Sequence, residues 1–336
     1  MKVDLNKWYR AKVDNQAHKA LTEKSDWQGI KHVSIWIAAL LFTGYMAYQT
    51  WGTWWTVFWF FIYGNIYMAS NPVWHECGHK TPFKSRWLNE LFYQVGSFMF
   101  NLEPIRWRWS HFKHHSYTLY TTDPYDYEIQ ITKPTDLIYF FLLLIPCGPF
   151  LLIFKSIGPH TAQVETIKHA IGITTPVMRD VIPEKERAKC RFFARIHFSI
   201  WILIIIISFV VKSWLPILFV ILPYYYGNTL RNTFDIMQHG GLAHNVKDHR
   251  LSTRTVILNP IFSFLYWHME YHIEHHMFPL VPSHNLGKLH HLIKDQLPPP
   301  KKGLWEAYKE IIPAVFKQAK DPNYKINVKI PNPNKV

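Results

Sequence analysis

Long apolar runs joined by short polar links are the feature that most limits how this chain can fold. Residues 33–48 and 54–69 are almost entirely apolar, and residues 198–211 and 215–226 form a second such pair. A helix needs about 20 mostly apolar residues to cross the bilayer core, where every backbone polar group must be bonded within the protein. The pattern therefore predicts an all-α integral membrane protein with two transmembrane hairpins, or about four spanning helices.

A further apolar stretch, residues 137–154, is broken near its middle by Pro146, Gly148 and Pro149. Proline and glycine interrupt helices, and each half is too short to span a bilayer. This stretch is therefore predicted to form a re-entrant or interfacial hairpin, with a single kinked spanning helix as the alternative. Residues 155–197 are basic and amphipathic, so they are predicted to lie on the cytoplasmic membrane surface.

The charge distribution indicates a membrane partner and an orientation. The chain has 37 Lys and Arg against 23 Asp and Glu, which gives a formal net charge of +14. Basic residues flank the apolar runs, as expected beside an anionic membrane face, and the pattern does not favour nucleic-acid binding. Lysines precede residue 33 and follow residue 69, so the positive-inside rule places both ends of the first hairpin in the cytoplasm. We expect an integral protein of the cell membrane (the inner membrane in a bacterium), with no cleaved signal peptide.

These features divide the chain into three predicted parts. Residues 1–32 form a cytoplasmic N-terminal segment, and residues 33–295 form the membrane domain with a cytoplasmic helical cap. Residues 296–336 form a cytoplasmic C-terminal tail, with a helix over residues 305–319. Both termini and the functional site are predicted to lie on the cytoplasmic side.

Eight of the 20 histidines fall into three short groups at helical spacing. Residues three or four apart share a face of a helix, so each group can direct its imidazoles at one point. An even number of membrane crossings between the second and third groups brings all three to the same side of the bilayer. The candidate catalytic and metal-binding residues are His75, His79, His111, His114, His115, His272, His275 and His276.

Eight imidazoles exceed what one metal ion binds, since zinc usually takes four ligands, so two metal centres are predicted. A lone histidine is usually a packed or surface residue, but solvated histidines have no reason to adopt this pattern. Imidazole binds iron, zinc, copper and nickel. With iron, such a site can use O₂ to remove hydrogen from an unactivated C–H bond, whereas zinc has no redox chemistry. A site at the membrane boundary favours a lipid-soluble alkyl substrate.

His239 is the candidate ninth ligand, because it follows the second hairpin, where a helix should emerge near the metals. His244, His268 and Asn259 are the alternatives. The remaining histidines with a specific prediction are assigned to the polar surface: His249, His284, His290 and His291.

Acidic residues near the histidines are candidates for holding the rings in place. Metal-bound histidines usually donate their second N–H to a carboxylate or carbonyl. Asp235 lies one helical turn before His239, so it is the favoured partner of that ring. The acids predicted for this role at the metal site are Glu76, Asp123, Asp235 and Glu274, with Asp126 and Glu270 as further candidates.

Two other kinds of protein are compatible with parts of the pattern. His75-Glu76-x-x-His79 matches the HExxH motif of zinc proteases, in which Glu76 would be the general base. A protease needs one further ligand, whereas this chain offers two additional histidine triplets. A haem-carrying membrane cytochrome would place histidines in pairs inside apolar helices, and here they cluster at helix ends in polar sequence.

The three groups have the sequences HECGH (75–79), HFKHH (111–115) and HIEHH (272–276), the last followed by MFPLVP. Their order and spacing resemble the histidine boxes of the integral-membrane fatty acid desaturase family, over roughly residues 33–295. The same superfamily contains alkane and xylene hydroxylases and carotenoid oxygenating enzymes. The resemblance implies that the eight box histidines ligate two irons. It also implies an additional ligand after the last hairpin, the place that His239 occupies.

The resemblance implies an O₂-dependent di-iron oxidoreductase, with a fatty acyl desaturase as the expected activity. The alternative is a hydroxylase or monooxygenase that acts on an alkane or a small methylated compound. Relatives receive electrons from ferredoxin, rubredoxin or cytochrome b5. The three cysteines lack CxxC spacing and cannot supply a four-cysteine iron–sulfur cluster. A separate electron donor with its reductase is therefore expected, docking on the basic face.

Overall fold

The chain is built almost entirely of helices. The computed structural model describes residues 8–128, 137–148 and 162–331. Within these ranges the only strands are β1 (Val256–Ile257) and β2 (Lys301–Lys302), which pair in parallel. The predicted helical class is confirmed at this level.

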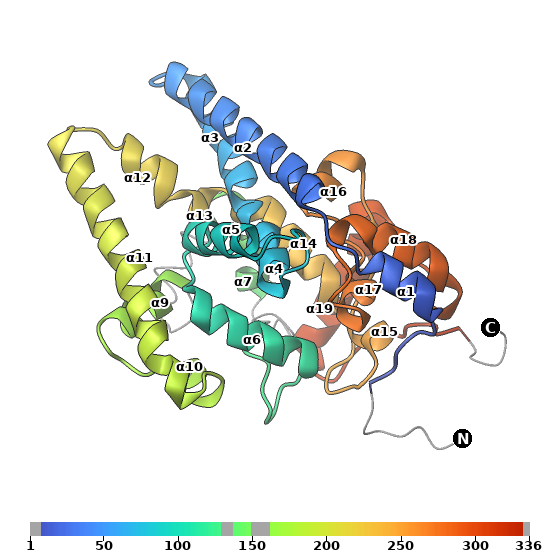
Figure 1. Cartoon of the computed structure of the whole chain (residues 1–336). Helices are drawn as coiled ribbons and strands as arrows, with labels where there is room; N and C mark the ends of the chain where they lie inside the picture. Colours follow the sequence, from blue (N-terminus) through green and yellow to red (C-terminus); the bar gives the residue numbers. More distant parts are fainter. Residues whose placement is uncertain (1–7, 129–136, 149–161, 332–336) are drawn as a thin grey trace.

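Two helices in the described ranges are long and apolar enough to cross a membrane, α2 (Asp26–Gln49) and α11 (Glu184–Val210). Helix α2 begins where the Ser25 hydroxyl accepts a hydrogen bond from the Gln28 amide at 3.3 Å. Their outer faces expose large apolar side chains, such as Leu41 at 67% and Phe209 at 72%. Such faces suit contact with lipid, because exposed apolar patches mark interaction surfaces. Figure 1 shows that the far ends of both helices lie away from the two chain termini.

The return arms of the two predicted hairpins are shorter than a full membrane span. Helix α3 (Trp54–Met68) has 15 residues, or about 22 Å at 1.5 Å per residue. The second arm is divided into α12 (Leu215–Val220) and α13 (Pro223–Tyr226), each with proline in its first turn. Two of the four predicted spanning helices are therefore found, and four full crossings are not confirmed.

Helix α11 corrects one predicted boundary. The basic segment 155–197 and the apolar run 198–211 were expected to be separate elements, but one continuous helix begins at Glu184 and includes both Arg195 and Trp201. Hydrophobicity changes along this helix without any helix-breaking residue, so the backbone continues through it. The rest of the basic segment contains α9 (Ala162–Ala170) and α10 (Pro176–Asp180).

The helices that carry the candidate metal ligands lie below the long helix α2 in Figure 1. Helix α4 follows α3 directly, and α14 follows α13, so the two hairpins deliver histidines to the same region. The helices that carry the candidate metal ligands are α4 (Ser70–His79), α6 (Pro104–Ser116), α14 (Asn228–His239) and α17 (His272–Met277). The helices packed around them are α1 (Asn15–Leu21), α5 (Arg86–Met99), α15 (His249–Ser252), α16 (Pro260–Leu265) and α18 (Ser283–Ile293).

Described segments near both ends of the chain pack onto these helices. Near the N-terminus, Ala11 and Leu21 share a buried apolar cluster with Leu286 of α18. Helix α19 (Gly303–Lys320) buries Ala307 and Ile311 in the main core, and it contacts α14. The predicted tail helix 305–319 therefore forms, but its inner face is part of the folded body. The domain boundaries at residues 32 and 295 stay predictions.

The apolar stretch 137–154 is described only in part. Helix α7 (Leu137–Leu143) is followed by a turn with Cys147 at φ 60°, and residues 149–154 lie outside the described residues. The choice between a re-entrant hairpin and a kinked spanning helix therefore stays a prediction.

Candidate metal centre

The first two histidine boxes are fixed by helix ends and by aromatic packing. Helix α4 stops immediately after His79, because Lys80 adopts a left-handed conformation at φ 60°. The Glu103 carboxylate caps α6, accepting hydrogen bonds from the Ile105 and Arg106 amides at 2.8 and 2.6 Å. Trp107 of α6 packs on Trp74 of α4 with ring centroids 4.2 Å apart and stacks on His111 at 4.3 Å. This contact fixes the second box against the first.

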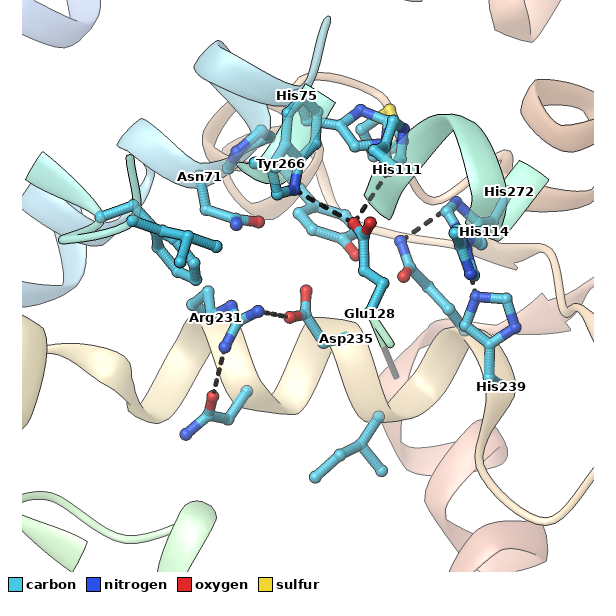
Figure 2. Close-up of a pocket in the computed structure, with 18 of the residues that line it drawn as sticks. Asn71, His75, His111, His114, Glu128, Arg231, Asp235, His239, Tyr266 and His272 are labelled. Atoms are coloured by element: carbon cyan, nitrogen blue, oxygen red, sulfur yellow. Dashed lines mark hydrogen bonds and ion pairs between the residues drawn. The ribbon is translucent and has the colours of Figure 1, made fainter. Parts of the chain in front are cut away.

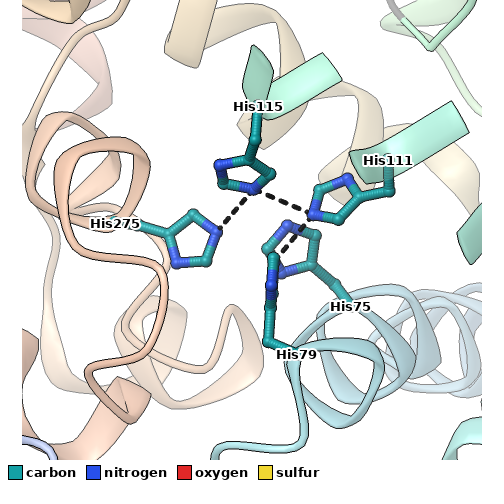
Figure 3. A group of neighbouring side chains, drawn as sticks. All are labelled: His75, His79, His111, His115 and His275. Atoms are coloured by element: carbon teal, nitrogen blue, oxygen red, sulfur yellow. Dashed lines mark hydrogen bonds between the residues drawn. The ribbon is translucent and has the colours of Figure 1, made fainter. Parts of the chain in front are cut away.

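Five histidines from three helices form the first cluster (Figure 3). The His111 Nε2 atom lies 2.8 Å from His79 Nε2 and 3.0 Å from His115 Nε2. His275 Nε2 of α17 lies 3.2 Å from His115 Nε2. The members, whose candidate ligand atoms all lie within 4.8 Å of one another, are His75, His79, His111, His115 and His275.

Four buried histidines form the second cluster, with candidate ligand atoms again within 4.8 Å: His114, His239, His272 and His276. The Nε2 atoms of His239 and His276 each lie 3.1 Å from His272 Nε2. The two clusters are adjacent, since the rings of His115 and His276 have centroids 4.4 Å apart. All eight box histidines and His239 therefore meet in one paired site, and their role as metal ligands stays a prediction.

Helix geometry explains how each HxxHH box serves both clusters. The fourth residue along a helix lies about 40° further round the axis, whereas the third lies about 60° back. In α6, His111 and His115 therefore reach the first cluster and His114 reaches the second. In α17, the four-residue pair, His272 and His276, joins the second cluster, and His275 joins the first. One short helix thus contributes to two neighbouring sites.

The hydrogen-bond partners of the Nδ1 atoms determine which ring nitrogen carries the proton in two of these histidines. His239 Nδ1 lies 2.8 Å from the Ser252 carbonyl oxygen, which can only accept a hydrogen bond. The Thr118 hydroxyl donates to the His114 carbonyl at 2.7 Å, so it accepts from His276 Nδ1 at 3.2 Å. His239 and His276 therefore carry their protons on Nδ1 and direct lone pairs on Nε2 into the second cluster.

These lone pairs test whether the site fits a metal ion. Two lone pairs that face the same buried space repel each other unless a cation lies between them. Burial lowers the pKa of His239 to about 3, so this ring stays neutral and offers a ligand atom. Burial likewise lowers the pKa of His75 and His79 to about 3. The donor set is thus neutral imidazole throughout most of the site, and it fits two metal ions.

Carboxylates support rings in both clusters. Asp126 Oδ2 lies 2.8 Å from His114 Nδ1, and Glu128 Oε1 lies 2.8 Å from His111 Nδ1. Burial opposes the charging of His114, but Asp126 outweighs it and raises the pKa of that ring, as a carboxylate partner also strengthens a histidine ligand. Glu76 is fully buried, with Oε1 3.6 Å from His75 Nδ1 and 3.7 Å from His275 Nδ1. The predicted role of Glu76 beside the histidines agrees with this placement.

Three of the predicted acidic partners lie elsewhere. Asp123 is exposed on the loop after α6. Asp235 pairs with Arg231, and the Ser252 carbonyl takes the place predicted for Asp235 beside His239. Glu274 accepts a hydrogen bond from Thr255 Oγ1 at 2.6 Å and pairs with His290. Among the described residues, the hydrogen bonds and ion pairs of Asp235 and Glu274 go to groups outside the two clusters, so the structure does not place these acids beside the rings as predicted.

Two histidines assigned to the surface are buried. His249 is 3% exposed, and its ring centroid lies 4.8 Å from that of His276. His290 is 7% exposed and pairs with Glu274. Among the alternatives to His239, Asn259 caps α16 through the Phe262 amide at 2.9 Å, and His268 Nδ1 bonds Ser263 Oγ at 2.8 Å. Nothing in the local sequence distinguishes these environments, because tertiary packing creates them.

Some supporting groups had no local sequence signal. Glu128 stands 17 residues after His111, and Thr118 and Ser252 lie outside the boxes.

Among the described residues there is also a third group, Glu103, His169 and Cys190, in which the Cys190 thiol donates to Glu103 Oε1 at 2.8 Å. Because Glu103 caps α6, this group holds the helix that carries the second box.

A cavity of about 190 Å³ adjoins both clusters (Figure 2). His75 and His111 of the first cluster and His114, His239 and His272 of the second lie on its wall. A molecule in this cavity therefore lies beside histidines of both clusters, which makes the cavity the candidate substrate site.

Replacing Asp126 with asparagine should lower metal affinity at the second cluster by about 10–100-fold. Asparagine has the same size as aspartate, but its neutral amide holds the proton on His114 Nδ1 less strongly than a carboxylate does. Metal content after dialysis against a graded series of chelator concentrations measures the effect. Asp123→Asn, an exposed acid on the same loop, is the control. Equal metal retention by both variants would contradict the role given to Asp126.

The fold and the paired clusters define a mostly helical protein with an imidazole-lined site beside apolar helices. Residues 50–308, more than half of the chain, match the family model described as fatty acid desaturase. A search of curated proteins finds no match. The chain belongs to the fatty acid desaturase family, as its three histidine boxes predicted. Family membership and the two long apolar helices indicate a membrane-bound oxidoreductase.

Proposed function

We propose that this protein is a di-iron, O₂-dependent oxidoreductase that removes hydrogen from an unactivated C–H bond. The observation that carries the proposal is the pair of adjacent clusters, five and four histidines, that converge as neutral imidazoles. Iron ions bound there would supply electron transfer to O₂ and the oxidising power that breaks the C–H bond. Family membership favours desaturation of a fatty acyl lipid as the reaction.

The residues of the chain would then have distinct tasks. The nine clustered histidines would hold the ions, and Asp126 and Glu128 would orient His114 and His111 through Nδ1. Glu76 lies near His75 and His275, at 3.6 and 3.7 Å from Nδ1. Burial of His114 and His276, 3% and 4% exposed, keeps bulk water from the site. The adjoining cavity positions the C–H bond beside both clusters.

Hydroxylation is the second candidate, and the cavity wall favours it. Desaturation removes two hydrogens and, with two electrons and two protons from a donor, converts O₂ to two waters. Hydroxylation uses the same electrons but places one oxygen atom in the product. Several charged and amide side chains line the cavity, among them Asn71, Arg231 and Asp235, and such a wall suits a small substrate better than a long hydrocarbon chain.

We place the long helices across the membrane with both termini and the histidine site on the cytoplasmic side. Lys24 and Lys31 near the start of α2, and Lys80 and Lys84 after α4, support this orientation under the positive-inside rule. The short arms α3 and α12–α13 would complete the two hairpins. Labelling of single cysteines introduced near Thr53 and Lys212 with an impermeant reagent tests the orientation.

Electrons would come from a separate donor of the ferredoxin, rubredoxin or cytochrome b5 type, with its reductase. The three cysteines are free, and Cys77 and Cys190 are buried, so these residues cannot form a four-cysteine iron–sulfur centre. The strong positive charge of the chain would steer an acidic carrier to its basic face.

Replacing Glu76 with glutamine separates this function from a zinc protease. Glu76 Oε2 accepts hydrogen bonds from Thr81 Oγ1 at 3.1 Å and from the Ser283 amide at 3.2 Å. This oxygen therefore links α4 to the start of α18. We expect the variant to lose about 10–100-fold in iron affinity and to keep part of its turnover. Turnover and bound iron are measured together, with exposed Glu23→Gln as the control. Complete loss of turnover in a variant that keeps its full metal content would favour the protease.

Product analysis tests the proposed reaction directly. The full chain is reconstituted in lipid with a reductase, ferredoxin and O₂, and is offered saturated acyl chains, alkanes and small methylated compounds. New double bonds or hydroxyl groups, formed with matching O₂ consumption, are the expected result. Peptide cleavage, or no oxidation of any compound by iron-loaded protein, would contradict the proposal.

A further inference from the structure

One face of α14 runs from the second histidine cluster along the wall of the cavity. Arg231, Asp235 and His239 are spaced four residues apart, so they lie on one side of the helix, and all three line the cavity. With a rise of 1.5 Å per residue, Asp235 and Arg231 lie about 6 and 12 Å from His239 along the axis. This face therefore places polar groups at a fixed distance from the candidate reaction site.

The cavity wall contains hydrogen-bonding groups that the described residues leave unpartnered. Arg231 pairs with Asp235 and donates from Nη1 to Asn232 Oδ1 at 3.1 Å, but its buried Nε has no partner. Glu128 Oε1 contacts His111 and Trp107, while its buried Oε2 has no partner. Figure 2 shows the Arg231–Asp235 pair, Glu128 and Asn71 around one common space. Buried polar groups without partners cost free energy unless a ligand completes them.

The arginines on this wall are paired with carboxylates. Arg231 is paired with Asp235, and Arg106, the other arginine on the wall, is paired with Glu165 at 2.7 Å. Both arginines of the described wall are thus already paired, and Glu128 lies on the same wall. A carboxylate ion would therefore find no unpaired arginine on the described wall, and a plain hydrocarbon would leave the polar groups desolvated without partners.

We propose that the substrate is a compact molecule with a hydroxyl or primary amide group held between Arg231, in its pair with Asp235, and the Glu128 carboxylate. Such a group accepts a hydrogen bond from the arginine and donates one to a carboxylate, which neither a carboxylate ion nor a ketone does. Its reacting C–H bond lies at the histidines, about 6–12 Å from the polar group. This inference rests on the proposed function and names its substrate class.

Four probes of equal chain length test the proposal: octan-1-ol, octanamide, octanoate and n-octane. Iron-loaded full-length protein in lipid nanodiscs is assayed for oxidised product with reductase, ferredoxin and O₂. Binding is measured separately by saturation-transfer NMR without O₂. We expect kcat/KM for octan-1-ol and octanamide to exceed that for octanoate and n-octane at least about ten-fold, with the same order in binding. Equal or better use of n-octane or octanoate would overturn the proposal.

A double variant tests the residues. Arg231→Leu with Asp235→Leu removes both charges together, so that neither is left buried alone. The preference for octan-1-ol over n-octane should fall to within about two-fold, while bound iron stays at the wild-type level. Arg108→Leu with Glu90→Leu removes a more exposed ion pair off the cavity wall, and should keep the preference. A double variant at Arg231 and Asp235 that keeps it, in turnover and in binding, would overturn the assignment.

The proposed reaction and the proposed polar subsite can be rejected separately. If iron-loaded protein oxidises none of the probes but still binds octan-1-ol in preference to n-octane, the proposed reaction fails and the polar subsite stands. If the protein oxidises n-octane or a long saturated acyl chain in preference to octan-1-ol, the reaction stands and the subsite is rejected.

Discussion

Replacing His276 with alanine should abolish turnover and reduce bound iron from about two ions per chain to about one. The second cluster has four imidazoles, so the variant would retain three. His115→Ala should also abolish turnover but lose less iron, because it leaves four imidazoles in the first cluster. Both outcomes follow from a reaction that needs both ions while the clusters differ in ligand number.

The measurement combines metal content with product formation in membranes that contain equal amounts of each variant. His291→Ala is the matched control, because His291 is exposed on α18 and belongs to neither cluster. Retained turnover in His276→Ala would remove this residue from the site. Equal loss of iron from both variants would contradict the five-and-four division.

Replacing Gly227 with alanine should prevent the protein from folding into its native form. The Cβ atom of an alanine would overlap the backbone carbon and oxygen of Gly64 in α3, and neither backbone can move without displacing α14. Overpacking usually costs about 1–3 kcal/mol, and overlap with backbone should cost more than about 3 kcal/mol. Small residues allow helices in membranes to approach this closely, and this contact aligns the helix that ends at His239.

The yield of folded protein and its thermal unfolding midpoint in detergent measure this effect. Gly287→Ala is the control, because its Cβ would meet its nearest neighbour, the Tyr271 hydroxyl oxygen, at an ordinary 3.5 Å. That substitution lies inside α18 and should be neutral or stabilise by about 0.5–1 kcal/mol. A Gly227→Ala protein as stable as Gly287→Ala would show that the close contact of α3 and α14 is not needed.

The positions of the metal-site histidines could be predicted from the sequence because the information is local. Spacings of three and four residues determine which rings share a helix face, and the polar sequence around the boxes places them at helix ends. His239 could be singled out because it follows an apolar hairpin. The division of His114 from His111 and His115 also follows from helix phase, once two clusters are considered separately.

The partners of the rings could not be predicted in the same way. Asp126 and Glu128 reach His114 and His111 only because the loop after α6 folds back onto that helix. Asp235 has the right spacing for His239, but Arg231, one turn earlier on the same helix, pairs with it instead. Choosing between such partners requires the tertiary structure, because a carboxylate can bond to either neighbour.

Helix limits in the membrane region were also beyond the sequence pattern. Hydrophobicity rises sharply near residue 198, yet α11 begins at Glu184, because amphipathic turns continue into the apolar run without a break. The apolar run 215–226 is divided into α12 and α13 at Pro223. Apolar composition indicates where a chain can meet lipid, but proline positions and packing decide where each helix ends.

Metal analysis of protein purified without oxygen tests the central claim most directly. Two neighbouring clusters of neutral imidazoles should hold close to two iron ions per chain, and the His276→Ala protein should hold close to one. A single tightly held zinc ion per chain, or two irons that remain in full after His276 and His115 are both replaced, would contradict the paired site.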